Sequence, residues 1–86
     1  MPEISRFFGI VIRMNFNDHA PPHFHARYGD ENVAIEIATL TVIAGNLTPR
    51  ALGLVMEWAA KHRDELFSDW ILAQEGKLLL PIAPLR

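Results

Sequence analysis

The chain has 86 residues, half of them apolar and 21% charged, a composition typical of one packed domain and unlike that of a disordered protein. It contains no cysteine, which excludes disulfides and thiolate metal sites such as zinc fingers and favours a reducing compartment. A formal net charge of −2 argues against a nucleic-acid-binding surface that covers the whole domain.

The N-terminal residues lack the basic region and long apolar run of a secretory signal. The apolar runs elsewhere span only a few residues, whereas a membrane-spanning helix needs roughly 20. We therefore expect one domain, residues 1–86, that is cytoplasmic and has no membrane contact.

Alternation of apolar and polar residues predicts strands in the first half of the chain. Even-numbered residues from Phe8 to Phe16 are apolar, so residues 4–16 are predicted to form one strand. Residues 17–22 contain two prolines and predict a loop. Residues 23–28 and 33–37 then predict two strands joined by a turn at residues 29–32, and a weaker strand covers about residues 40–44.

The apolar faces of the strands at residues 23–28 and 33–37 can meet only in certain registers, because a slip of one residue would turn every side chain over. Each of those registers puts Glu36 on the same side as His23, His25 and Arg27.

Helical patterns fill the second half. Thr48 and Pro49 favour a helix start, and the helix is expected to continue to about His62. A second helical stretch covers residues 64–75, and the pattern leaves open whether the chain bends between the two. A short strand is possible at residues 78–80. The expected fold is α+β: a small antiparallel β-sheet of three to four strands followed by two helices, or one bent helix, packed on one face.

The segment from Asn17 to His25 concentrates the chemistry, with three of the four histidines and one carboxylate in nine residues. His23 and His25 are two residues apart on a strand and point the same way, with Cβ atoms roughly 6 to 7 Å apart. Imidazole is the side chain best suited to proton transfer at neutral pH and the commonest metal ligand.

Three interpretations compete. In the first, a divalent metal is the cofactor, and its ligands come from one cluster of side chains: Asp18, His19, His23, His25 and Glu36. In the second, His19, His23 and His25 act as general acid and base on an RNA phosphodiester while Arg27 stabilises the developing charge. In the third, the histidines are structural or form a partner-binding surface.

Three strings in the chain resemble a known family: Ile4-Ser5-Arg6-Phe7-Phe8-Gly9-Ile10, then Asp18-His19-x-Pro21-Pro22-His23-Phe24-His25, and Leu54-Val55-Met56-Glu57-Trp58-Ala59. They look like the small bacterial proteins grouped as domain-of-unknown-function family 4160, and the likeness covers nearly the whole chain. The family's activity is unassigned. Its members often lie in gene pairs, so the resemblance implies one member of a toxin-antitoxin-like pair.

Two functions are therefore expected. The first is an effector that acts on RNA or binds a metal through the histidine-rich segment. The second is a non-catalytic protein-binding or regulatory module, such as the neutralising partner of the pair. The expected partners are a small protein encoded nearby, RNA, or a second copy of the chain in a homodimer.

Overall fold

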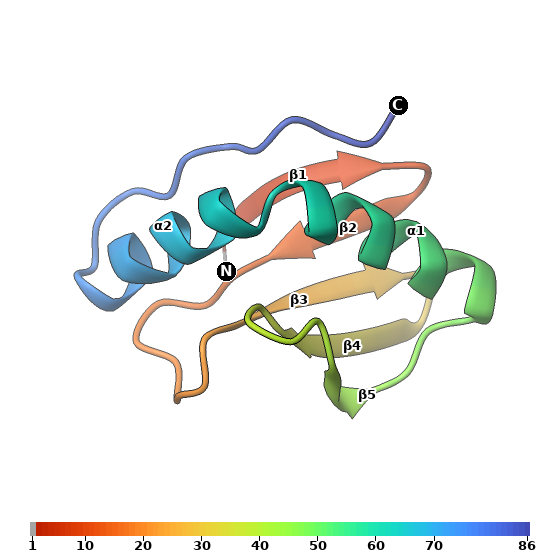
Figure 1. Ribbon diagram of the computed structural model, residues 1–86, viewed down its shortest axis with the longest axis horizontal. Helices are drawn as coiled ribbons and strands as arrows, with labels where there is room; N and C mark the ends of the chain where they lie inside the picture. The colour runs from red at the N-terminus through yellow and green to blue at the C-terminus, as the bar shows by residue number, and fades with distance from the viewer. Residues whose placement is uncertain (1) are drawn as a thin grey trace.

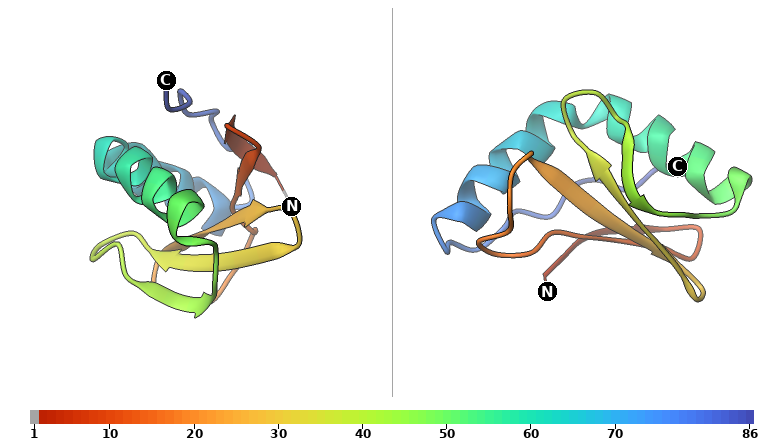
Figure 2. Two further views of the ribbon diagram at one scale, coloured as in Figure 1. Left: turned by 90° about the vertical axis from the view of Figure 1, so that its right-hand side faces the viewer. Right: turned by 90° about the horizontal axis from the view of Figure 1, so that it is seen from below.

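The computed structural model describes residues 2–86, which form a five-stranded antiparallel sheet with two helices on one face (Figures 1 and 2). The strands follow one another in space as they do in sequence. The elements are β1 (Glu3–Phe7), β2 (Ile10–Arg13), β3 (His23–Tyr28), β4 (Glu31–Glu36), β5 (Val42–Gly45), α1 (Pro49–Lys61) and α2 (Arg63–Gln74). The α+β class is confirmed, but the sheet has five strands where three to four were predicted.

The extra strand arises because residues 4–16 do not form the single predicted strand. The chain reverses at Phe8 and Gly9, whose φ angles are 50° and 79°, and β1 and β2 pair as a hairpin. A two-residue turn puts Phe7 and Ile10 opposite each other on the buried face, and leaves Phe8 62% exposed. The prediction of one continuous strand put Phe8 on the same apolar face as the other even-numbered residues. This is wrong, because the apolar alternation continues through a turn that it does not reveal.

The β3–β4 hairpin has the predicted faces. His23 pairs with Glu36 and His25 pairs with Ala34, so Glu36 lies on the same side as the histidines, as predicted. Phe24 and Ile35 are fully buried beneath the helices. Both helices formed by residues 2–86 lie on this one face, and the opposite face of the sheet is left uncovered by them (Figure 2).

The second half contains two separate helices. They break at His62, whose φ of −126° and ψ of 25° are not helical. Trp58 of α1 is fully buried and its ring lies against Phe7 and Phe24 of the sheet, at centroid distances of 5.5 and 5.9 Å. No helix among residues 2–86 is long and apolar enough to cross a membrane.

Residues 78–80 form no strand, in contrast to the prediction. The C-terminal segment is extended and runs back beside β1 (Figure 1), where the amide of Ile82 donates to the carbonyl of Ile4 over 2.8 Å. The indole of Trp58 donates to the carbonyl of Ala83 over 2.8 Å, and Ile82 and Leu85 are buried. The tail therefore completes the hydrophobic core.

Candidate metal centre

Asp18, His23 and His25 converge at one end of the sheet. Each offers a ligand atom, and these three atoms all lie within 4.8 Å of one another. Asp18 Oδ2 is 2.9 Å from His23 Nε2 and 3.4 Å from His25 Nε2. We call these three residues the Asp18 triad.

Strand geometry and a short loop bring the triad together. His23 and His25 are two residues apart on β3, so their rings leave the same face, and their centroids are 5.0 Å apart. The loop after β2 returns Asp18 to this face. Two bonds from the end of α2 help to hold the loop: Asn17 donates its amide to the Ala73 carbonyl, and Gln74 donates to the Asp18 carbonyl.

Hydrogen bonds fix the orientation of each triad member. The carbonyl of Pro21 lies 2.8 Å from His23 Nδ1, and because a carbonyl only accepts, that nitrogen carries the proton. In the neutral ring the lone pair is then on Nε2, which faces Asp18. Asp18 Oδ1 accepts the amide of His19 over 2.8 Å, which leaves Oδ2 toward the rings.

A carboxylate oxygen opposite an imidazole lone pair is repulsive unless a positive charge lies between or on them. A cation bound between Nε2 and Oδ2 would relieve this repulsion. Two ligand atoms of a tetrahedral zinc ion, each about 2.1 Å from the metal, lie about 3.4 Å apart. The 3.4 Å separation between Asp18 Oδ2 and His25 Nε2 meets this requirement, whereas the 2.9 Å separation between Asp18 Oδ2 and His23 Nε2 would have to widen by about 0.5 Å around an ion.

The triad is sheltered but still open to solvent. The exposed side-chain fractions of His23, Asp18 and His25 are 9%, 19% and 28%, so an ion can enter from solvent while most of its surroundings are protein. The ring of Trp70, on α2, lies 5.3 Å from that of His23 and covers one side of it.

The electrostatics favour a charged acid beside a neutral base. Partial burial raises the pKa of Asp18, but the His19 amide and the neighbouring His25 and His23 rings lower it by more, so it lies below its ordinary value. Burial lowers the pKa of His25, assisted by the charges of His23 and Arg13 and opposed by Asp18. At neutral pH, Asp18 is thus ionised and His25 is neutral, the states that a metal ligand needs.

The other predicted residues lie outside the triad. His19 is exposed and contributes its backbone amide, and Glu36 pairs across the sheet with His23 but supplies no ligand atom to the group. Arg27 is two residues beyond His25 on β3, where its Nε donates to the carbonyl of Gly29.

Two neighbours of the triad were not assigned to it from the sequence. The amide nitrogen of Asn15 lies 3.2 Å from Asp18 Oδ2 and 3.4 Å from His25 Nε2, while its Oδ1 is buried without a partner among residues 2–86. Arg13 pairs with His25 across β2 and β3. The sequence signal for both was their odd-numbered position in the alternation of residues 4–16, opposite in phase to the apolar even-numbered residues.

One family model, described as "Domain of unknown function (DUF4160)", matches residues 9–71, which include the whole triad, Asn15 and Arg13. No match was found among the curated proteins or among the solved structures.

Proposed function

The chain belongs to the family of domains of unknown function DUF4160, and we propose that it binds a divalent transition-metal ion through Asp18, His23 and His25. One observation supports this proposal above the others: the Pro21 carbonyl holds the His23 ring in the tautomer whose free nitrogen faces a carboxylate. A metal-binding histidine usually donates its other ring N–H to such a carbonyl or to a carboxylate.

The donor set narrows the choice of ion. Two imidazoles and one carboxylate suit zinc, iron, nickel or cobalt better than calcium or magnesium, which prefer oxygen ligands. Three protein ligands leave at least one coordination position for water or substrate, as in catalytic rather than structural zinc sites. A metal bound there would supply a Lewis acid and an acidified water.

The test is direct measurement of metal binding. Wild-type protein stripped with a chelator should bind close to one equivalent of Zn²⁺, Ni²⁺ or Co²⁺ by calorimetry, with elemental analysis as a second readout. His25→Gln should weaken binding at least about a hundredfold, since one of three ligands is lost and even outer-shell changes cost 10- to 100-fold.

The matched control is His19→Gln. It removes an imidazole from the same loop but not from the triad, so binding should stay within about twofold of wild type, well below the change expected for a lost ligand. Equal weakening by the two variants, or no binding of any of these ions by the wild type, would refute the proposal.

RNA cleavage within a toxin-antitoxin-like gene pair is the activity we propose for this site. Its support is His25, whose burial lowers its pKa, together with Arg13, its partner across β2 and β3, whose charge also lowers that pKa. Induced expression should slow growth of a bacterial host, and His25→Gln should relieve it. Expression of wild type without any growth defect would count against this activity and leave metal binding standing.

A non-catalytic binding module is the alternative. It is favoured by β5, an edge strand whose residues are all exposed, including Val42 and Ile43 at 37% and 43%. An edge strand can pair with a strand from another chain, either a small partner protein or a second copy. Under this alternative Ile43→Lys abolishes partner capture or dimerisation and His25→Gln has no effect on either. The opposite pattern would exclude it.

A further inference from the structure

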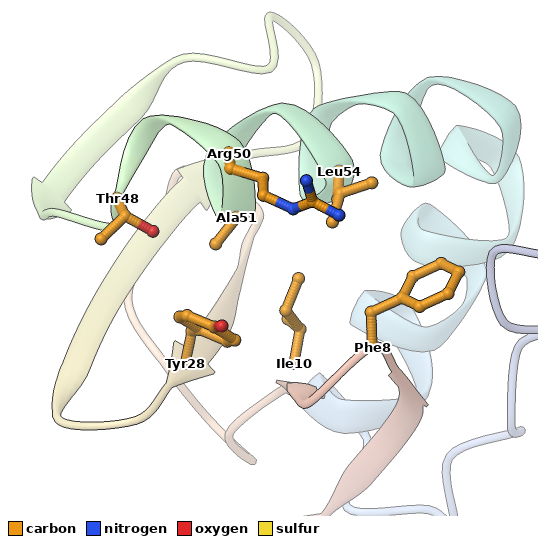
Figure 3. A pocket seen from close by; sticks show the side chains of 7 residues that line it. All are labelled: Phe8, Ile10, Tyr28, Thr48, Arg50, Ala51 and Leu54. Carbon is orange, nitrogen blue, oxygen red and sulfur yellow. The ribbon is translucent and has the colours of Figure 1, made fainter.

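A second candidate site lies between the β1–β2 turn and the first turns of α1, and it shares no residue with the Asp18 triad (Figure 3). It is a cavity of about 150 Å³. Ile10, Ala51 and Leu54 supply its apolar walls, while Phe8, Tyr28 and Arg50 surround its opening.

The size and walls of the cavity fit one small apolar group. Ile10 and Ala51 are 0% and 2% exposed, so they form a rigid floor beneath the cavity, and the apolar surface open to a ligand comes from Leu54, Phe8 and Tyr28. A cavity of about 150 Å³ has the volume needed to hold a benzene molecule, and here Thr48 and Arg50 add polar groups at its edge. The cavity therefore accommodates a single aromatic ring or a branched aliphatic group.

The guanidinium of Arg50 lies at the opening of this cavity. Figure 3 shows Arg50 extended across the opening, above Tyr28 and Ile10. Its guanidinium makes no hydrogen bond or ion pair within residues 2–86, and the nearby carboxylate of Glu31 is instead bound to the Thr48 amide at 2.8 Å. The hydroxyl of Thr48 does not cap α1 and also faces the cavity.

Phe8 provides an independent reason to expect a ligand. Its φ of 50° lies in the left-handed region, where a bulky residue is strained, and its side chain is 62% exposed. Asparagine or glycine would suit this turn better. A role of the ring in binding a ligand would account for the presence of phenylalanine at a strained turn position where it gains little from packing.

We infer that this cavity binds a small monocarboxylate that carries one aromatic or branched apolar group. The apolar group would occupy the space between Ile10 and Leu54, and the guanidinium of Arg50 would take the carboxylate in a two-point contact. Arg50 is the one cation that lines the cavity, so a single negative charge is matched and a phosphate dianion is not.

The test is titration of the full chain with phenylacetate, followed by calorimetry and by amide shifts of Ala51 and Tyr28, in EDTA so that metal at the Asp18 triad cannot contribute. Benzyl alcohol, which lacks the charge, should bind at least about tenfold more weakly, since a charge-assisted hydrogen bond is worth more than one factor of ten. Acetate, which lacks the ring, should also bind at least about tenfold more weakly, since it buries almost no apolar surface. Equal binding of all three compounds would overturn the inference.

Two substitutions test the residues. Arg50→Gln should weaken phenylacetate binding at least about tenfold. Arg63→Gln, the control at an exposed arginine in the first turn of α2, should not change it. Phe8→Asn should weaken binding while the melting temperature stays level or rises, because asparagine tolerates the left-handed turn. Unchanged affinity in both Arg50→Gln and Phe8→Asn would reject the site.

The carboxylate could come from a free metabolite or from the C-terminus of a peptide. Acetyl-Ala-Ala-Phe with a free carboxyl group and its C-terminal amide separate the two sources. Binding of the acid alone supports a peptide C-terminus, and binding of phenylacetate but neither peptide supports a free small molecule. Equal binding of the amide and the acid would contradict the role of Arg50.

Discussion

Asp18→Asn separates a metal ligand from a structural ion pair. Asparagine has nearly the shape of aspartate, its oxygen can still accept the His19 amide, and its NH₂ group can donate to the lone pair on His23 Nε2. The metal-free variant should therefore unfold with a free energy within about 1 kcal/mol of wild type, the size of one typical net hydrogen bond. The substitution removes the anionic ligand, so metal binding should be lost.

The magnitude of the metal effect follows from mass action. At a free metal concentration a hundred times the dissociation constant, binding adds about 2.7 kcal/mol to the free energy of unfolding. In a domain of this size that raises the melting temperature by roughly 10 to 20 °C, at about 4 to 8 °C per kcal/mol. Differential scanning fluorimetry with and without Zn²⁺ should show this rise for wild type and none for Asp18→Asn.

The opposite result is equally clear. If Asp18 and His23 served only as a structural ion pair, removing the charge from this mostly buried position would destabilise the metal-free protein by about 3 to 5 kcal/mol. Two results together would refute the proposed metal centre: a metal-free Asp18→Asn protein destabilised to that extent, and a wild-type protein whose melting temperature does not respond to metal.

Three further predictions concern stability. Because burial lowers the pKa of His25, metal-free protein should lose stability as the pH falls through the ordinary histidine value of 6.5. The urea concentration at the midpoint of unfolding should therefore fall with pH in wild type and fall less in His25→Gln. A wild-type midpoint that stays constant from pH 7.5 to 5.5 would contradict this prediction. Trp58→Phe should lower the free energy of unfolding by about 1 to 3 kcal/mol in urea titrations, because the Ala83 carbonyl loses its donor; a loss below about 0.5 kcal/mol would contradict it. Gly45→Ala should lower the free energy of unfolding by at least about 1 kcal/mol more than Gly76→Ala. Both residues have positive φ, but a Cβ at Gly45 would clash with the backbone oxygen of Asn32, whereas one at Gly76 meets nothing within 4 Å; equal melting temperatures of the two variants would contradict this reasoning.

Local patterns were enough to predict the elements with strong periodicity. The two faces of the β3–β4 hairpin and the start of α1 at Pro49 agree with prediction, because a buried face restricts a strand pair and Thr-Pro favours a helix start. The turn is shorter than the predicted residues 29–32, since β4 begins at Glu31. The β1–β2 turn was missed since only Gly9 marks it, and Phe8 is a poor residue for a left-handed turn. Its conformation is imposed by pairing of the flanking strands, which local pattern does not contain.

The candidate site was predictable to the extent that strand geometry determines it. Two residues apart on one strand, His23 and His25 had to face the same way, and they do. The directions of Asp18 and His19 depend on loop dihedrals, including a φ of 52° at Asn17, and on bonds from α2 more than fifty residues later. Sequence proximity therefore grouped His19 with the other two histidines, although its side chain lies outside the triad.

The docking of residues 82–85 against Ile4 and Trp58 means that the first strand and the last residues of the chain are layers of the same core. A translation product that stops short of Ile82 would lack one of these layers and would expose apolar surface to chaperones and proteases.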